Sequence, residues 1–375
     1  MIKDTLYYKN AYLDNFETTV KECIEENGKI KVVLEETAFY PEGGGQPSDI
    51  GIINNIKVLK VEEKAGKIYH YVEKEIPVNK EVKCKIDFDK RFLNMQNHTA
   101  EHIVSGLICR KFNSTNVGFH IGSDFVTIDF NVTLSNEELK EIELQANEAI
   151  YQNIEIKTNL YTNEEASNMN YRSKIDLKED VRLIEIPGYD VCACCGIHVA
   201  RTGEIGIIKL VKIEKYKSGV RIYMLAGSKA LEDYDNKYEQ VSKISSLLSL
   251  KLDEVYTGVK ALSKEIEELK KEKNSLKEII FEQEISNLDK QENIIIEKEN
   301  LDMKDMKNYC EKLKTKSEKI SVVVSNGRFI MMSDTEDLKL ILEDLKTKLD
   351  LQGGGNSQMV QGMIKCETKK IIELI

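Results

Sequence analysis

The sequence predicts an α+β protein of several domains. Short β-type runs dominate the N-terminal part, helices and strands mix in the middle, and a long charged helix precedes a compact α/β piece. A chain of 375 residues is also too long for one ordinary hydrophobic core. We expect four segments in chain order: a small β-barrel-like domain over 1–88, an α+β domain with a metal site over 89–235, a long coiled-coil-like helix over 236–290, and a small α/β domain over 291–375.

The N-terminal segment is rich in β-type sequence. Three short apolar runs lie at 31–34, 56–61 and 68–72, and 82–88 alternates strictly between apolar and polar side chains. Strict alternation is typical of a strand with one buried face. Together these runs favour a small barrel.

A glycine-rich stretch interrupts these runs at 37–49. It holds three successive glycines, Gly43, Gly44 and Gly45, between two prolines. Such backbone can lie against a sugar or a phosphate and offer N–H donors, which makes the stretch a candidate ligand-binding loop. A cluster of β-turns is the structural alternative.

Two helices are expected in the middle segment, followed by a strand-rich part from 181 to 225. The first helix covers about 90–111. The second begins at Ser135, which forms a capping-box pattern with Glu138 ahead of an amphipathic run that ends near Gln152.

Four side chains of this segment indicate a metal site. His98 and His102 are four residues apart on a predicted helix, so both imidazoles lie on one face. Cys194 and His198 follow a strand-like run and the Pro187–Gly188 turn, so we expect them on a loop. Imidazole and thiolate are ligands that zinc prefers, and three of the five histidines fall in these two motifs. We predict one zinc ion per chain.

The number of ligands matters for what the zinc would do. Four protein ligands make a closed, structural site, whereas catalysis needs an open position. His98, His102 and Cys194 are the primary ligands of this prediction, while His198 is a fourth ligand, a holder of water, or a group that exchanges with substrate. Cys192 and Cys195 also form a CxxC pair, which indicates redox chemistry or a different choice of ligand.

The helix of the third segment carries a heptad-like seam. From Leu248 to Ile280 the apolar residues recur alternately after four and three positions, with Lys273 as the polar interruption. This repeat is typical of a coiled coil or a long helical hairpin, so the helix needs a partner from this chain or from a second subunit.

The last segment is predicted to contain strands at 320–324 and 328–332, joined by an Asn-Gly turn, and a helix over about 335–349. Three more glycines follow: Gly353, Gly354 and Gly355. They would let the backbone approach another group closely, or simply allow a tight reversal.

Composition limits the setting. The N-terminus lacks the apolar run of a signal peptide, and no segment is long and apolar enough for a membrane span. The eight cysteines do not form a disulfide-type pattern, so we expect a soluble protein in the reducing cytoplasm.

Charge gives two opposing indications about nucleic acid. The net charge of −10 argues mildly against a phosphate-binding surface. However, 201–229 holds seven Lys or Arg against two Glu, and Lys212 and Arg221 are among them. A solvated strand face is the alternative explanation of this basic segment.

Several motifs together resemble a known family. NHTAEH at 97–102, followed by CACCGIHV at 192–199 and RTGEIG at 201–206, resembles the editing domain of alanyl-tRNA synthetase and its free-standing AlaX relatives. FYPEGGGQPSDIG at 39–51 looks like the glycine-rich motif of that family. GGGNSQMVQG at 353–362 resembles the C-terminal domain of the same synthetases, a module associated with dimerisation and with the elbow of tRNA. The likeness covers about residues 4–375.

The resemblance implies a long AlaX-type protein that acts in trans, since the chain starts directly at the editing-like region. Such a protein hydrolyses the ester between a wrong amino acid and alanine tRNA; serine is the chief candidate and glycine is left open as a second. It implies zinc as cofactor, mischarged alanine tRNA as partner and a homodimer, with no membrane and no nucleotide cofactor. Where the family often has a second glycine and a threonine, this chain has Cys195 and Ile197.

The resemblance also implies site roles. An apolar pocket cannot strongly reject an analogue that only adds a hydroxyl, so a second site has to contact that hydroxyl. Thr37 is the candidate contact, with Gln46 nearby. Glu101 is a candidate proton acceptor or a partner of an imidazole, and a helix-surface carboxylate is its alternative. The tRNA path would follow the basic segment and both glycine triplets.

Two other functions fit parts of the same sequence. His98-Thr-Ala-Glu101-His102 also matches the HxxEH motif of a zinc peptidase, in which the glutamate is the base. Such an enzyme would take its third ligand from a downstream glutamate and would have no use for Cys194 and His198. The second alternative is a non-catalytic, zinc-stabilised dimeric module that binds tRNA or protein.

Overall fold

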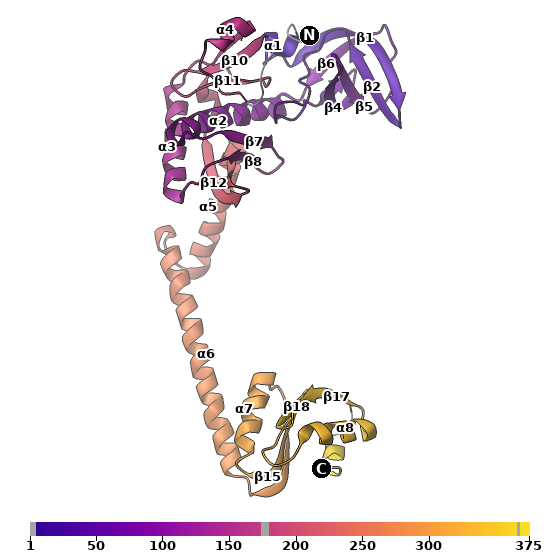
Figure 1. Cartoon of the computed structure of the whole chain (residues 1–375), viewed down its shortest axis with the longest axis vertical. Coiled ribbons are helices and arrows are strands. Elements are labelled where there is room, and N and C mark those ends of the chain that lie inside the picture. Colours follow the sequence, from indigo (N-terminus) through magenta and orange to yellow (C-terminus); the bar gives the residue numbers. More distant parts are fainter. Residues whose placement is uncertain (1–4, 174–179, 366–367) are drawn as a thin grey trace. The chain divides into compact units, whose positions relative to one another are not determined.

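The computed structural model describes residues 5–173, 180–365 and 368–375. The chain divides into two compact units, Met1–Lys243 and Ile244–Ile375 (Figure 1). Among the described helices, none combines the length and the apolar character that crossing a lipid bilayer requires.

The N-terminal part of the first unit is a closed six-stranded barrel, which confirms the barrel-like prediction. Its strands follow the order β1-β2-β5-β4-β3-β6 around the barrel. The elements are α1 (Leu6–Lys9), β1 (Asn15–Glu26), β2 (Lys29–Leu34), β3 (Gly51–Ile53), β4 (Ile56–Lys64), β5 (Lys67–Val72) and β6 (Glu81–Ile86). Alternate residues of β6 are buried, as its sequence predicts, because successive side chains of a strand point to opposite faces.

The rest of this unit surrounds one long helix with two sheets. A four-stranded sheet has the order β12-β13-β8-β7, and a three-stranded sheet has the order β11-β10-β9. The elements are α2 (Phe88–Phe112), β7 (Asn116–Ile121), β8 (Val126–Phe130), α3 (Asn136–Gln152), β9 (Lys157–Tyr161), α4 (Asn163–Ser167), β10 (Val181–Ile186), β11 (Asp190–Ala193), η1 (Thr202–Ile205), β12 (Ile208–Tyr216), β13 (Gly219–Ala226) and α5 (Ser228–Leu248).

Helix α2 is central, because every residue from 94 to 108 is buried. Its N-terminus is capped by the Asp87 carboxylate, which accepts from the backbone N–H of Lys90 at 3.1 Å. At the start of α3, the Ser135 hydroxyl accepts from the Glu138 N–H, and the Glu138 carboxylate accepts from the Ser135 N–H. The predicted capping box is therefore confirmed.

One buried ion pair joins α2 to the segments around the barrel. Arg91 and Asp49 are 0% and 3% exposed, and the Arg91 guanidinium donates to the Asp49 carboxylate. The guanidinium also donates to the carbonyls of Leu13 at 3.0 Å and Ala11 at 3.3 Å, and to that of Ala38. The guanidinium is thus fully hydrogen-bonded, which a buried charge requires.

The second unit contains a five-stranded sheet with apolar clusters on both faces. Its order is β14-β15-β16-β18-β17, and β14 and β15 run parallel. The elements are η2 (Leu252–Glu254), α6 (Val255–Ser286), β14 (Gln291–Glu297), α7 (Met303–Leu313), β15 (Ser317–Ser325), β16 (Arg328–Met332), α8 (Leu338–Lys348), β17 (Leu351–Gly355), β18 (Met359–Ile364) and α9 (Lys369–Ile372). The expected strand pair around Asn326–Gly327 is present as β15 and β16.

The long helix predicted over 236–290 is not continuous, because it is interrupted between α5 and α6. Ser249 has a left-handed backbone with φ 54°, which ends α5. The Ser245 hydroxyl donates to the Leu250 carbonyl at 2.6 Å, and a Cβ on Gly258 would lie 2.0 Å from Leu250 Cδ1. The Leu250 side chain therefore packs onto Gly258, and Leu248 and Leu252 fall outside the seam of α6.

The second glycine triplet is part of a strand and not a tight reversal. Gly353 and Gly355 lie in the edge strand β17, where Cβ atoms would approach the carbonyls of Gln361 and Met359 to 2.5 and 2.1 Å. The close approach that the sequence allowed is thus to the neighbouring strand β18. The preceding helix begins at Leu338, later than predicted, because Asp337 caps it.

Replacing Arg91 with Met should lower the free energy of unfolding by about 3–5 kcal/mol, because Asp49 would stay behind as an unpaired buried charge. Urea unfolding followed by circular dichroism measures this change. Lys90→Met, at a neighbouring exposed position, is the matched control and should leave the unfolding midpoint unchanged. Equal midpoints for the two variants would contradict a stabilising role of the pair.

Candidate metal centre

The four predicted ligands converge. His98 and His102 come from α2, and Cys194 and His198 come from the loop after β11. One ligand atom from each of them lies within 4.8 Å of the others. The Cys194 Sγ is 3.4 Å from His98 Nε2, and the His198 ring centroid is 4.6 Å from each of the other two imidazoles. Three nitrogens and one sulfur in this arrangement are a donor set that zinc accepts.

Each imidazole has an oxygen beside its outer nitrogen. The contacts are His98 Nδ1 to Gln46 Oε1 at 2.7 Å, His102 Nδ1 to Asp190 Oδ2 at 3.0 Å, and His198 Nδ1 to Thr99 Oγ1 at 3.2 Å. Metal-binding histidines commonly donate the N–H of their other nitrogen to such a partner, which fixes ring and tautomer. The three Nε2 atoms are thereby left for a metal.

Thr99 shows how one tautomer is fixed. Its hydroxyl donates its single hydrogen to the Met95 carbonyl at 2.8 Å. Toward His198 it can therefore only accept, so His198 Nδ1 carries the hydrogen. The His198 Nε2 is buried and has no hydrogen-bond partner among the described residues. A buried lone pair without a partner is costly, and a metal at this point would satisfy it.

Asp190 is held in place by Arg172. The guanidinium makes two hydrogen bonds of 2.7 Å to the carboxylate, one to each oxygen. Burial raises the pKa of Asp190, but Arg172 and His102 outweigh this effect and hold the pKa below its usual value. The aspartate therefore stays ionised beside His102. Neither Asp190 nor Thr99 was predicted from the sequence, because neither lies in a pattern that separates it from an ordinary polar residue.

The cluster is electrostatically coupled. Burial would raise the pKa of the Cys194 thiol, but the imidazoles of His98 and His102 hold it well below its usual value. Burial lowers the pKa of His102, yet Cys194 and Asp190 outweigh it and raise the pKa to about 10. For His198 burial dominates and lowers the pKa to about 3. A thiolate beside a protonated His102 follows from these opposite shifts.

Position 196 in the CCGIH motif requires glycine for a steric reason. A Cβ on Gly196 would lie 2.1 Å from His98 Cε1, and the Gly196 N–H donates to Cys194 Sγ at 3.2 Å. The loop can therefore reach the helix only with glycine at this position. The two cysteines of the CxxC pair lie in different environments, because Cys192 is buried and Cys195 is exposed. All seven cysteines of the described residues are free thiols.

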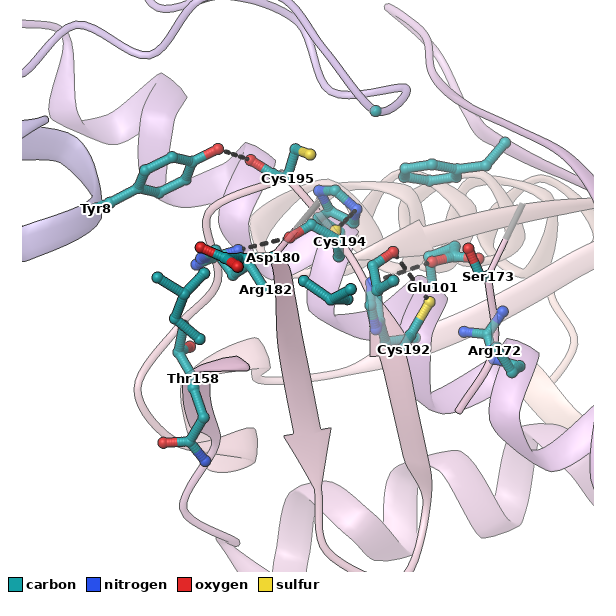
Figure 2. A pocket seen from close by; sticks show the side chains of 18 residues that line it. Tyr8, Glu101, Thr158, Arg172, Ser173, Asp180, Arg182, Cys192, Cys194 and Cys195 are labelled. Atoms are coloured by element: carbon teal, nitrogen blue, oxygen red, sulfur yellow. Dashed lines mark hydrogen bonds and ion pairs between the residues drawn. The ribbon is translucent and has the colours of Figure 1, made fainter. Parts of the chain in front are cut away.

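A cavity of about 550 Å³ opens onto the cluster. It is lined by His98, His102, Cys194 and Glu101, together with residues of β9 and β10 (Figure 2). At one side Tyr8 donates from its hydroxyl to the Cys195 carbonyl at 2.8 Å, and the Arg182 guanidinium lies 4.6 Å from the Tyr8 ring centroid (Figure 2). A small organic group can therefore reach the ligand atoms.

Glu101 is not a helix-surface carboxylate, because it is only 3% exposed and lies in the cavity wall. Its Oε1 accepts from the Ser105 hydroxyl at 2.6 Å and from Asn116 Nδ2 at 2.5 Å. Its Oε2 is 3.9 Å from His102 Nε2. One carboxylate oxygen is thus fixed by two donors while the other lies near the ligand atoms.

The residues of the first glycine-rich stretch lie at two different places in the structure. Gly44 lines the cavity, and Gln46 contacts His98. Thr37 instead lines another cavity, next to β1 and β2, where its hydroxyl is 2.9 Å from His70 Nε2 and accepts from the Phe39 N–H at 3.1 Å. The structure therefore brings Gln46, and not Thr37, to the metal ligands.

The basic segment lies in the β12–β13 hairpin, where many of its charges are paired. Arg221 makes two hydrogen bonds to the Asp129 carboxylate, at 2.7 and 2.8 Å. Lys212 contacts Glu214 at 2.6 Å, and Lys209 contacts Glu143 at 2.6 Å. The local excess of positive charge counted from the sequence is thus partly neutralised by Asp129 of β8 and Glu143 of α3.

Comparisons with known proteins agree with this geometry. The family model "Threonyl and Alanyl tRNA synthetase second additional domain" matches residues 181–223, and "tRNA synthetases class II (A)" matches residues 4–90. The alanyl-tRNA editing protein AlaX-L of Pyrococcus horikoshii is 28% identical over 99% of this chain and 97% of its own length. The resemblance to the alanyl-tRNA synthetase editing domain and its AlaX relatives is thus confirmed.

Alanine–tRNA ligases are also similar to this chain. The ligase of Methanobrevibacter smithii is 34% identical over 73% of this chain, and that of Pyrococcus abyssi is 31% identical over 99%. The chain spans 33% and 43% of the length of these two ligases. The matched range 181–223 contains Cys194, His198 and the β12–β13 hairpin, so the likeness includes the loop half of the metal cluster.

Zinc binding should release about one proton at neutral pH, because metal ligands have to be deprotonated. The lowered pKa of Cys194 leaves a thiolate, whereas the raised pKa of His102 leaves a proton that the metal displaces. The apparent affinity should therefore rise with pH up to the pKa of His102 and fall in acid. Titration calorimetry in two buffers of different ionisation enthalpy measures the released proton. A binding enthalpy independent of the buffer would contradict the assignment.

Proposed function

We propose that this protein is a zinc-dependent hydrolase that acts in trans and removes a wrong amino acid from alanine tRNA, chiefly serine and secondly glycine. The observation that carries the proposal is the convergence of His98, His102, Cys194 and His198 at the end of a cavity. The likeness to AlaX-L over 99% of the chain supports the substrate class.

In the proposed reaction, the metal and the side chains have different roles. Zinc, when bound, supplies a Lewis acid that polarises a carbonyl or lowers the pKa of water. Three imidazoles and a thiolate would hold it, and Gln46, Asp190 and Thr99 would orient the imidazoles. Four protein ligands fill a tetrahedral shell, so His198 either stays bound or gives way to the substrate.

Glu101 is suited to handle the proton. Ser105 and Asn116 fix its Oε1, so its Oε2 keeps one position at the cavity wall. There it accepts the proton of the water that attacks the ester carbonyl, and it returns that proton to the leaving ribose oxygen. The products are the free amino acid and the uncharged tRNA.

Selectivity requires a polar contact to the extra hydroxyl of serine. A site with a buried polar group rejects an analogue that leaves this group unpaired, by far more than an apolar pocket rejects an added hydroxyl. The resemblance assigned the contact to Thr37, whose hydroxyl is engaged with His70 and Phe39. Glu101 is a carboxylate in the cavity wall, beside the metal ligands, that could accept from serine in its place.

The two alternatives make different demands on the same residues. A zinc peptidase of the HxxEH type would need a downstream glutamate as ligand, whereas Cys194 and His198 complete this cluster. A purely structural zinc would need no cavity at its ligands and no fixed carboxylate beside them. The cavity and the orientation of Glu101 favour the hydrolase.

For partners, we propose mischarged alanine tRNA and a second copy of the chain, in the cytoplasm. Along α6 the apolar residues Leu262, Ile266, Leu269 and Leu276 are 41–55% exposed, as a helix that pairs with another subunit would leave them in one chain. The tRNA would follow the β12–β13 hairpin and both glycine triplets.

Purified protein should release serine from the seryl ester of alanine tRNA much faster than alanine from the alanyl ester. Cys194→Ala should abolish this release, because it removes a ligand, and Glu101→Gln should lower it by about 10²–10⁴-fold, the usual contribution of a general base. Rapid-quench assays with labelled amino acids measure both. No release by zinc-loaded wild type would leave only the binding module, and peptide hydrolysis that survives Cys194→Ala would favour the peptidase.

Reversing the charge of Lys212 and Arg221 to Glu should weaken tRNA binding, because the hairpin would no longer neutralise phosphates. The slope of log affinity against log salt should then fall by about one for each phosphate that is left unneutralised. Filter binding at several salt concentrations measures the slope. The control is Lys57→Glu with Lys83→Glu, at exposed barrel positions. An unchanged slope in the hairpin variant would place the tRNA elsewhere.

A further inference from the structure

The glycine-rich stretch delivers one buried side chain to the metal cluster. Gln46 is 1% exposed and closes a tight turn, in which Gly43 and Gln46 exchange two backbone hydrogen bonds of 3.0 and 3.1 Å. Gly44 and Gly45 occupy the turn with φ of 59° and 82°, a region that residues with a Cβ seldom adopt. The backbone conformation of this turn therefore requires the two glycines, and the turn sets the position of Gln46.

The turn is also fixed against β7. A Cβ on Gly45 would lie 2.5 Å from Phe119 Cδ1 and 2.7 Å from the Phe119 carbonyl oxygen. The Gly45 carbonyl accepts from the Ile121 N–H at 3.0 Å. The position of Gln46 is therefore set by contacts on both sides of the turn.

The Gln46 side chain makes two hydrogen bonds through one atom. Its Oε1 accepts from the Ile197 N–H at 3.3 Å and lies 2.7 Å from His98 Nδ1. A backbone N–H can only donate, so the atom facing it is the amide oxygen and not the amide nitrogen. His98 Nδ1 must then donate to the same oxygen, which leaves the lone pair of His98 on Nε2, 3.4 Å from the Cys194 sulfur.

We propose that Gln46 is a positioning residue of the metal centre, and that the glycine-rich stretch serves in this chain to place it. A single atom, Gln46 Oε1, contacts both segments that carry the predicted metal ligands. His98 lies on α2, and Ile197 precedes His198 in the loop. The proposal rests on zinc binding by the cluster, as proposed above, but not on the reaction.

The amide nitrogen of Gln46 also supports a positioning role. Gln46 Nε2 is buried and has no hydrogen-bond partner among the described residues, which costs about 1–3 kcal/mol. Gln46 is also among the residues that line a second cavity, next to β4. A residue kept for contact with substrate would direct a donor into the cavity of the cluster. Gln46 directs an acceptor at His98 instead.

The test is the zinc affinity of the full-length protein. Gln46→Met keeps the volume and removes the acceptor, so the dissociation constant for zinc should rise by about 10–100-fold, the usual cost of losing such a partner. Gln46→Glu keeps an oxygen for both donors and should retain the wild-type affinity. Competition with a chromophoric chelator measures the constant, and the visible spectrum of the cobalt-substituted protein reports the ligand geometry.

Gln96→Met is the matched control, because Gln96 is a buried glutamine on α2 that donates to the Glu204 carbonyl at 2.8 Å and does not contact the ligands. It should bind zinc as wild type does. Wild-type affinity in Gln46→Met, or equal losses in Gln46→Met and Gln46→Glu or in Gln46→Met and Gln96→Met, would overturn the positioning role. If wild type itself bound no zinc, the metal centre would fail together with it.

Discussion

The buried pair between Arg91 and Asp49 is the constraint on which the site depends. Asp49 closes the glycine-rich stretch, Arg91 begins the buried part of α2, and the guanidinium also binds the carbonyls of the N-terminal segment. The two partners of the His98–Gln46 contact therefore lie on two segments that this pair holds together. A buried charge pair does little for net stability compared with apolar packing, but it is satisfied in only one arrangement of its segments. That arrangement sets the barrel against the helix of the metal ligands.

The metal cluster also depends on polar contacts between separate segments of the chain. Three imidazoles and a thiolate gathered without water would be costly unless each outer nitrogen had a partner, and Gln46, Asp190 and Thr99 supply one oxygen each. These oxygens come from the barrel side, from β11 and from α2 itself. The centre is therefore assembled by three separate parts of the fold, and its inner face carries three Nε2 atoms and a thiolate, the donor set that a zinc ion needs.

The sequence predicted those parts of the fold that local interactions specify. The closed barrel followed from alternation in short runs, and the start of α3 followed from Ser135 and Glu138, which contact each other within one turn. The convergence of the four ligands was inferred from residue types and one helical spacing. The break after Leu248 was missed because the heptad-like seam continues through it, while the packing of Leu250 on Gly258 decides the backbone. The place of Thr37 was missed for a related reason, since its partner His70 is distant in the chain.

By itself the sequence determined which residues could bind a metal, which alternating runs form the barrel strands, and where α3 begins. These properties depend on side-chain chemistry and on neighbours within a few residues. Only the tertiary structure decided which oxygen faces each imidazole, which glutamate oxygen remains available, and which of the basic side chains are already paired. Each of these contacts joins positions far apart in the chain, such as 46 with 98 or 129 with 221, and depends on how whole elements pack. The donors and acceptors were present in the sequence, but their pairing is a consequence of the fold.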